Sequence, residues 1–184
     1  ISLAAYAIWV AITILVGRYL SGSKPAPLIE GISHGIAWNI VAAGAFLVLL
    51  ARVCNWRDLK LCAPKPWSSL VILWFPALYI VGFLVASAMA GPVSAKVTAF
   101  ILINTLFVGF SEELMFRGVL FQALRTKLRL WPAIIITCLL FGAVHVLNVF
   151  TTGEFWNSAL QALTAAMSGL VFMALLIRTG SLWV

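Results

Sequence analysis

Three charged side chains lie inside an apolar part of the sequence. Glu112, Glu113 and Arg117 are the only charges in the stretch 97–124, which is longer than the ~20 apolar residues that a membrane-spanning helix needs. An acid or an arginine in mid-membrane costs about 2.5–3.5 kcal/mol on insertion scales, and such residues generally belong to functional sites. The chain has only 5 acidic residues, so two in this place predict a site with carboxylate chemistry, such as general acid–base catalysis.

The spacing of these residues separates their roles. Glu113 and Arg117 are four residues apart with the acid first, which is the favourable order for an ion pair on a helix. Glu112 lies about 100° further around the helix, so the arginine neutralises it less well. We therefore expect a Glu113–Arg117 pair that supports the site and a Glu112 carboxylate that is free to act as a base. The alternative for the pair is an ion pair that only locks helix packing.

His145 is the expected partner of Glu112. It lies deep in the next apolar stretch, one helical turn after Phe141 and on the same face. A neutral imidazole facing a free glutamate would polarise a water molecule between them, whereas a lone buried histidine would serve only packing. Asn148 follows three residues later, and either completes this polar site or bonds a backbone carbonyl.

Composition indicates the elements that must position these residues. Apolar residues make up 64% of the 184 residues and charged residues 9%, whereas soluble domains are about half apolar and a quarter charged. We expect an all-α fold, a polytopic transmembrane helical bundle that forms one membrane-embedded domain over 1–184. Its first part, 1–96, carries three spans of low specificity, and its second part, 97–184, carries the motifs. The six expected spans are 2–20, 32–51, 69–90, 97–124, 131–150 and 157–177.

The 12 Lys and Arg residues predict how the bundle is oriented. If the spans alternate, one side receives Arg52, Arg57, Lys60, Lys65, Arg125, Lys127, Arg129 and Arg178, and the other receives Arg18, Lys24 and Lys96. The positive-inside rule places the first side, with the start of the first span, in the cytoplasm. These charges form no basic cluster on a soluble face, so we expect membrane lipid and no nucleic acid as a partner. A multi-pass protein of the plasma (inner) membrane of a bacterium is the expected localisation.

Local signals add four expectations. The length of the stretch 97–124 predicts a tilted or broken helix, with the break at Gly109–Ser111 and the two acids opening a second helix. Pro76 should kink the third span, whereas Pro132 opens the fifth harmlessly. His34 is expected at the outer membrane interface. A disulfide between Cys54 and Cys62 has no support beyond their closeness in sequence.

Other kinds of chemistry fit the sequence less well. It contains no H-E-x-x-H, no G-x-S-x-G, no P-loop and no dinucleotide-binding glycine pattern. Zinc normally takes at least three protein ligands, and one deep histidine with glutamates falls short of such a set. We therefore expect no cofactor, with a divalent metal such as zinc as the open alternative. A proton-relaying transporter is disfavoured because no repeat symmetry is visible.

These motifs resemble a known family. Glu112-Glu113-x-x-x-Arg117, followed one span later by Phe141-x-x-x-His145, is similar to the CPBP membrane proteins, the CAAX protease and bacteriocin-processing (abortive infection) group. The type II CAAX prenyl endopeptidases belong to this group, and the resemblance covers about 97–184. It implies a helical bundle with a polar cavity open to the membrane and the cytoplasm.

The resemblance also implies an activity, the cleavage of a peptide bond in a membrane-adjacent or prenylated peptide. Glu112 and His145 would activate the attacking water, Glu113 and Arg117 would support them, and no metal is expected in CAAX-type members. The partner would be a peptide or protein substrate, with or without a lipid group.

One family motif is not found in the sequence. An H-x-x-x-N or H-x-x-x-D motif should follow the Arg178-Thr179-Gly180-Ser181-Leu182-Trp183 turn, but the chain stops at Val184. We expect that the chain is truncated and that a further span follows, and the enzymatic assignment depends on that motif. The alternative is a non-catalytic protein of the same fold, which acts in bacteriocin self-immunity or as a scaffold.

Overall fold

The computed structural model describes residues 1–21, 33, 35–56, 58–91 and 94–184, and these residues form helices and no strand. The first half holds α1 (Ser2–Ser21), α3 (Trp38–Val53), the 3-10 helix η1 (Trp67–Leu73) and α4 (Trp74–Ala90). The second half holds α5 (Ala95–Glu113), the π-helix η2 (Leu114–Leu120), α6 (Phe121–Arg125), α7 (Leu130–Val146), α8 (Val149–Thr152) and α9 (Phe155–Thr179). The predicted all-α bundle is confirmed.

Five helical segments are long and apolar enough to cross a membrane. They are Ser2–Leu20, Trp67–Met89, Ala95–Arg125, Leu130–Thr152 and Phe155–Thr179, and Trp38–Val53 is a shorter apolar helix. These six segments coincide with the six expected spans, except that the second begins at Trp38, later than expected. His34, Arg57 and Lys24 lie outside the described residues, so their predicted positions are not addressed.

The predicted break at Gly109–Ser111 is wrong. The segment Ala95–Arg125 runs as one helix, in which α5 continues through both acids and widens into the π-helix η2. Ser111 does not cap a new helix, because its hydroxyl is buried and accepts a hydrogen bond from the indole Nε1 of Trp9 at 2.9 Å. The extra length is accommodated by the π turns, which are frequent at functional sites.

The two prolines both lie in first turns. Pro132 is the third residue of α7, as predicted. Pro76 is the third residue of α4, at the change from the 3-10 helix η1 to the α-helix within the segment Trp67–Met89, and the kink that we expected there stays a prediction. The first N–H groups of a helix have no partner within it, and Pro132 therefore removes no hydrogen bond at its position.

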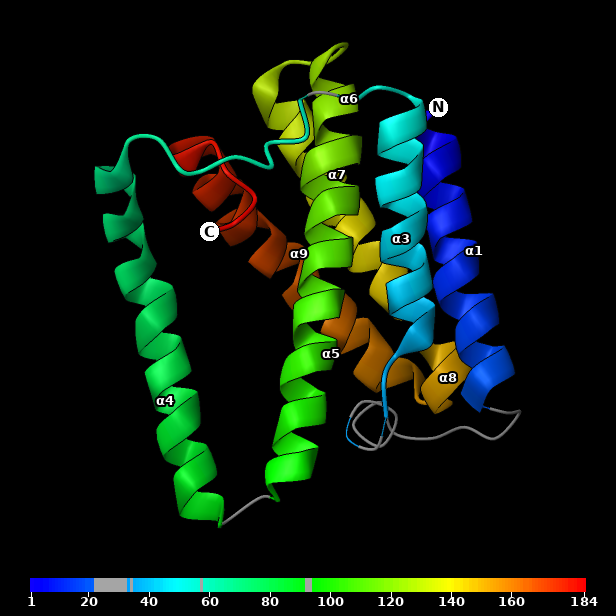
Figure 1. Cartoon of the computed structure of the whole chain (residues 1–184), viewed down its shortest axis with the longest axis vertical. Coiled ribbons are helices and arrows are strands. Elements are labelled where there is room, and N and C mark those ends of the chain that lie inside the picture. Colours follow the sequence, from blue (N-terminus) through cyan, green and yellow to red (C-terminus); the bar gives the residue numbers. More distant parts are fainter. Residues whose placement is uncertain (22–32, 34, 57, 92–93) are drawn as a thin grey trace.

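The helices are arranged as a bundle with one outlying member (Figure 1). α1 and α3 stand side by side next to the long helix that begins with α5, and α9 crosses behind it at a steep tilt. α7 packs along α9, and the packed core surrounds η2, where Trp9, Met115 and Phe116 are almost fully buried. α4 stands apart, and its large apolar side chains are exposed, as expected for a lipid-facing helix.

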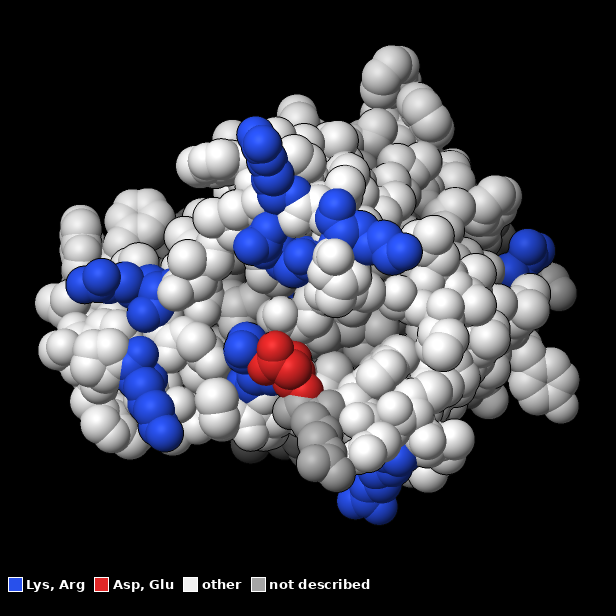
Figure 2. Space-filling model, turned by 90° about the horizontal axis from the view of Figure 1, so that it is seen from above, with Lys and Arg blue, Asp and Glu red and all other residues white. Residues whose placement is uncertain are grey.

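The start of α1, the end of α3 and the α6–α7 turn lie at the same end of the bundle (Figure 1). Figure 2 looks onto this end and shows several Lys and Arg side chains gathered around a hollow. This arrangement agrees with alternating spans, and the positive-inside rule would place this end in the cytoplasm. The three cysteines are free, so Cys54 and Cys62 form no disulfide.

The Arg178–Trp183 turn binds the loop that precedes η1. Gly180 adopts a left-handed backbone with φ +67°, which ends α9. The Ser181 hydroxyl donates to the Cys62 carbonyl at 2.5 Å, and the Leu182 N–H donates to the Lys60 carbonyl at 2.9 Å. Trp183 then stacks on Phe110 with ring centroids 6.1 Å apart. The turn thereby contacts the fourth span two residues before Glu112.

Gly142 sets the closest approach between α7 and α9. A Cβ atom at this position would lie 2.6 Å from the Ala162 carbonyl oxygen and 2.7 Å from the Ala166 Cβ. Small residues at such contacts let membrane helices pack backbone to backbone. Because His145 lies one turn along the same helix, this contact also fixes the histidine relative to α9.

Gly142→Ala is therefore expected to destabilise the protein by about 1–3 kcal/mol, because the added methyl group overpacks the contact. The midpoint of thermal unfolding in detergent measures this effect. Gly82→Ala is the matched control, since Gly82 lies in α4 and a Cβ there meets nothing within 4 Å. Equal midpoints for the two variants would show that the α7–α9 contact is not tight.

Candidate active site

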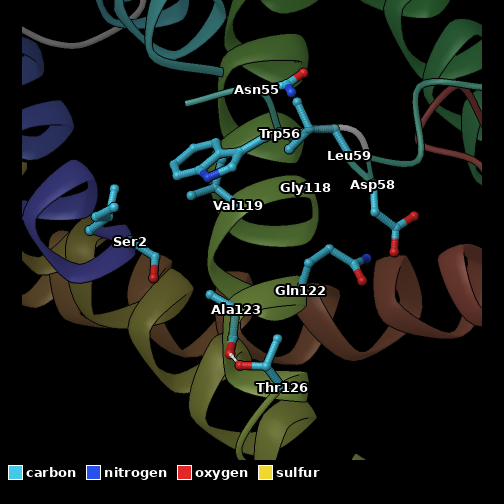
Figure 3. A pocket seen from close by; sticks show the side chains of 11 residues that line it. Ser2, Asn55, Trp56, Asp58, Leu59, Gly118, Val119, Gln122, Ala123 and Thr126 are labelled. Atoms are coloured by element: carbon cyan, nitrogen blue, oxygen red, sulfur yellow. Dashed lines mark hydrogen bonds between the residues drawn. The ribbon is translucent and has the colours of Figure 1, made fainter. Parts of the chain in front are cut away.

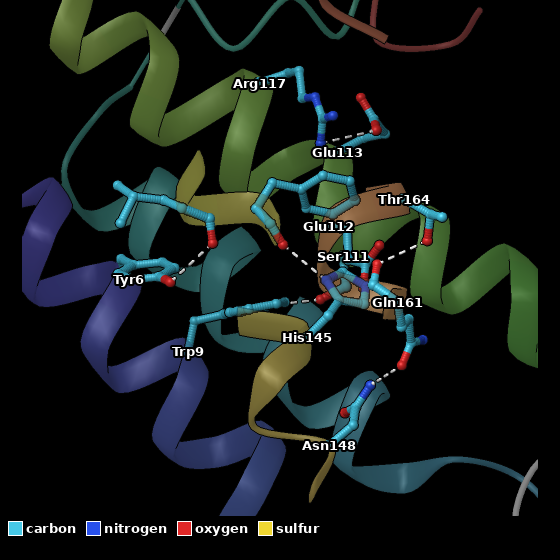
Figure 4. A network of polar contacts seen from close by, with 12 residues as sticks. Tyr6, Trp9, Ser111, Glu112, Glu113, Arg117, His145, Asn148, Gln161 and Thr164 are labelled. Atoms are coloured by element: carbon cyan, nitrogen blue, oxygen red, sulfur yellow. Dashed lines mark hydrogen bonds and ion pairs between the residues drawn. The ribbon is translucent and has the colours of Figure 1, made fainter. Parts of the chain in front are cut away.

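The structure brings Glu112 and His145 together. Glu112 lies at the end of α5 and His145 near the end of α7, and the glutamate Oε1 is 3.9 Å from the histidine Nε2 (Figure 4). Both side chains are largely buried, with exposed fractions of 21% and 14%. The sequence predicted this pairing, and the structure places the two groups as the prediction requires.

The hydrogen bond at Nδ1 of His145 determines the protonation of Nε2, the ring nitrogen that faces Glu112. Its Nδ1 is 2.8 Å from the Phe141 carbonyl oxygen. A carbonyl oxygen only accepts, so Nδ1 carries the proton, and in the neutral imidazole Nε2 is a bare acceptor. The distance of 3.9 Å also exceeds that of a direct hydrogen bond, which is about 2.7–3.2 Å. The Glu112 Oε1 and the His145 Nε2 are therefore two hydrogen-bond acceptors that face each other without a direct hydrogen bond.

Glu113 and Arg117 form the predicted ion pair, with the Arg117 Nη1 3.4 Å from the Glu113 Oε1 (Figure 4). The arginine side chain is fully buried, at 0% exposed. Within the described part of the chain its three nitrogens make no hydrogen bond. Aromatic rings surround the guanidinium, whose Cζ is 4.3 Å from the centre of Phe141 and 5.1 Å from that of Phe172. Cation–π attraction adds to the ion pair in holding the charge.

Phe141 connects the two halves of the site. Its ring lies under the Arg117 guanidinium and also meets the His145 ring edge to face, with centroids 5.1 Å apart. Its backbone carbonyl is the one that holds the histidine Nδ1. Sequence reasoning placed Phe141 on the face of His145 but did not predict the contact with the arginine. The one-turn spacing of Phe141-x-x-x-His145 was the available signal.

Trp9 of α1 supports the site through Ser111 of α5. The buried Trp9 indole donates to the Ser111 hydroxyl, directly before Glu112 in sequence (Figure 4). Gly44 of α3 lies beside Ser111, and a Cβ at position 44 would be in ordinary van der Waals contact with the Ser111 Cβ, at 3.7 Å. No motif in the first span indicated this contact, and sequence reasoning missed it.

Asn148 bonds a side chain on α9. Its Nδ2 donates to the Gln161 Oε1 at 2.8 Å, three residues after His145 in sequence (Figure 4). Of the two alternatives left open by the sequence, the amide thus belongs to the polar cluster and does not bond a backbone carbonyl with its side chain. Gln161 was not identified from the sequence.

Two cavities lie near the expected cytoplasmic end. One of about 380 Å³ opens among Trp56, Gly118, Val119 and Gln122 (Figure 3), and one of about 470 Å³ lies next to it at Arg52. Gly118 and Val119 directly follow Arg117 on η2, so the first cavity begins close to the site. Neither cavity is lined by any of the four predicted site residues.

The site offers few side-chain ligands for a metal ion. Zinc sites normally use three or four protein ligands. Among the described residues no group of three or more His, Cys, Asp or Glu side chains is close enough to hold an ion. Glu112 and His145 alone supply two donors, and Glu113 is paired with Arg117. These residues do not fit a zinc site of the usual kind.

The helical architecture and the largely buried glutamate–histidine pair define a class, the integral membrane proteins with ionisable side chains between their helices. Residues 94–184 match the family described as type II CAAX prenyl endopeptidase Rce1-like. The half of the chain that carries the site therefore belongs to this family, and with its apolar helices the chain is an integral multi-pass membrane protein. This family assignment supports a CAAX-type intramembrane protease at the level of the family.

No curated protein and no solved structure matches the chain. The family assignment therefore rests on the match over residues 94–184 and on the resemblance of the motifs inside it.

Proposed function

We propose that this chain is the catalytic part of an endopeptidase that hydrolyses a peptide bond with water held between Glu112 and His145. The observation that carries the proposal is the pair of acceptors, Glu112 Oε1 and His145 Nε2, 3.9 Å apart in a largely buried setting. A water that donates one proton to each would make two hydrogen bonds of about 2.8 Å. Its oxygen would then direct a lone pair away from both groups, towards a substrate carbonyl.

The proton balance follows from this geometry. As the water oxygen bonds to the carbonyl carbon, Glu112 takes one of its protons as a general base. The same carboxylic acid then gives the proton to the departing nitrogen as the C–N bond breaks. The second proton of the water stays on the new carboxyl group, so the products are a carboxylic acid and an amine, and transfer of that proton to the amine gives a carboxylate and an ammonium group. The glutamate returns to its starting form. His145, held by Phe141, orients the water throughout.

Glu113 and Arg117 act in this proposal as positioning residues. The guanidinium is anchored on Phe141 and Phe172, so its charge is fixed near the two glutamates. Its pairing with Glu113 keeps that carboxylate away from the water and leaves Glu112 as the free base. The catalytic set is thus Glu112 and His145, supported by the ion pair.

The substrate class follows from the family and the burial of the site. A peptide bond close to the membrane, as in a prenylated Cys-a-a-X terminus, can reach a site inside a helical bundle more readily than a folded soluble protein can. We propose a lipid-anchored or membrane-adjacent peptide as the substrate and the plasma membrane of a bacterium as the location. No nucleic acid takes part.

Cleavage is expected to be insensitive to metal chelators, because no step in this mechanism uses a metal. Initial rates would be measured with and without EDTA or 1,10-phenanthroline, with a zinc protease in the same detergent as the control that loses activity. A loss of cleavage that added zinc restores would contradict the metal-free mechanism.

The proposed function is tested by peptide cleavage. The full chain in detergent or nanodiscs would be given a fluorogenic peptide that ends in a farnesylated Cys-a-a-X sequence, alongside the same peptide without the lipid. We expect cleavage by the wild-type protein and its loss in His145→Ala. A folded wild-type protein that cleaves neither peptide would favour the non-catalytic alternative.

A further inference from the structure

The Asn148–Gln161 pair is a polar feature that the proposed mechanism does not use. Asn148 lies at the α7–α8 junction, three residues after His145, and Gln161 faces it from α9 (Figure 4). Both belong to the apolar spans Leu130–Thr152 and Phe155–Thr179. Side-chain amides in such segments are unfavourable unless their donors and acceptors are satisfied. The pair therefore requires an explanation.

Both amides are set on firmly held backbone. The Asn148 N–H donates to the His145 carbonyl at 3.1 Å, and its carbonyl accepts from the Thr152 hydroxyl at 3.0 Å. Gln161 directly precedes Ala162, whose carbonyl lies against Gly142 at the closest α7–α9 contact. The two amides are thus fixed relative to His145, as a substrate-binding group must be.

The hydrogen bond between the two side-chain amides leaves one acceptor and one donor group without a partner among the described residues. Asn148 uses Nδ2 and Gln161 uses Oε1, so the Asn148 Oδ1 and the Gln161 Nε2 remain. Neither atom has a hydrogen bond to another described residue, and both side chains are only half-buried. One residue of an extended peptide presents the complementary groups, an N–H and a C=O, on the same side of the chain.

A simpler role is helix–helix adhesion, since amides often bridge membrane helices and such bonds are worth about 0.6 kcal/mol on average. That role needs only the bond already made. It does not account for the two remaining polar groups of these half-buried residues, one of which, Asn148, lies one helical turn after the candidate catalytic histidine. Both groups are accounted for if a polar partner enters the site.

We infer that Asn148 and Gln161 form a peptide-binding subsite, in which Asn148 Oδ1 accepts the N–H and Gln161 Nε2 donates to the C=O of one extended substrate residue near the scissile bond. The inference rests on the proposed function, because the ligand is the substrate backbone of that same reaction. It deepens that function by assigning the contacts that hold the chain next to Glu112 and His145. Recognition of backbone in this way is independent of the substrate's side chains.

The test uses binding, so that it does not depend on turnover. The full chain with Glu112→Gln would be titrated with the fluorescent farnesylated Cys-a-a-X peptide and with a series in which one peptide N–H at a time is replaced by an ester oxygen. We expect one ester position to raise Kd about tenfold, equivalent to about 1.4 kcal/mol. In Glu112→Gln/Asn148→Leu the amide peptide should bind about tenfold more weakly, and the ester should then cause no further loss.

Gln161→Met in the same background tests the second contact, and should weaken the amide and the ester peptides alike. Thr164→Val is the matched control on α9, because the exposed Thr164 hydroxyl bonds only carbonyls of its own helix, and it should leave Kd unchanged. The ester series alters only the ligand, so it remains decisive even if Asn148→Leu does not fold.

Ester peptides that all bind as tightly as the amide would overturn the subsite, as would the absence of any peptide binding by the folded protein. Failure of the proposed function looks different. In that case the amide peptide binds to the wild-type protein with the predicted ester dependence, yet it is not cleaved.

Discussion

Replacement of Glu112 by glutamine is expected to lower kcat for peptide cleavage by about a thousandfold, within the 10²–10⁴ range of general-base catalysis. The amide has the same shape as the carboxylate but cannot take the proton from the attacking water. Folding should be preserved, because the contact between Glu112 and His145 at 3.9 Å is longer than a direct hydrogen bond. Initial rates with the fluorogenic peptide, at substrate concentrations above KM, measure the effect.

Glu154→Gln is the matched control for this substitution. Glu154 is exposed and precedes α9, where its carboxylate accepts from the Asn157 side chain, far in sequence from the site. This variant should keep wild-type activity. If Glu112→Gln retained more than about a tenth of the wild-type rate, the general-base assignment would be wrong.

Replacement of Glu113 by glutamine is expected to produce the largest loss of stability, about 3–5 kcal/mol, because it leaves a buried arginine without its counter-ion. Arg117 is 0% exposed, and its nitrogens have no hydrogen bond to take over in the described structure. The double variant Glu113→Gln/Arg117→Met removes the stranded charge, so it should recover most of the loss. Thermal unfolding midpoints in one detergent compare the single and double variants.

The exposed ion pair between Asp58 and Lys60 provides the control. Its atoms are 2.7 Å apart, but the Asp58 side chain is 75% exposed. Asp58→Asn should therefore change stability by no more than about 1 kcal/mol. A double variant that is less stable than Glu113→Gln alone would show that the arginine is stabilised by the aromatic rings without its carboxylate.

The spans and the central pair could be predicted from sequence because the membrane imposes simple rules. A helix must be long and apolar, so Glu112, Glu113 and Arg117 stand out, and their spacing places Glu113 next to Arg117. His145 stood out for the same reason. The structure confirms the helical bundle and brings both pairs together.

The π-helix could not be predicted, because its wider turns leave the hydrophobic pattern of an apolar span unchanged. Contacts between distant elements were missed because the sequence does not show which helices pack against each other. Trp9 is one of many apolar residues of the first span and Gln161 an isolated polar residue of the last, and only the packing of the helices brings them to Ser111 and Asn148.

The position of α4 could not be predicted from the sequence either. All its faces are apolar, so no stripe of residues indicates which face would pack. The packing near the site depends on Gly142, whose role is evident only when the neighbouring backbone is known.

The most direct test of the central claim is a double-mutant cycle on Glu112 and His145. If the two groups activate one water as a unit, then Glu112→Gln, His145→Ala and the double variant should all lower kcat by a similar factor, because either change removes the shared function. All three proteins should fold, as judged by their unfolding midpoints. Losses that multiply in the double variant, or cleavage that survives in it, would contradict the account.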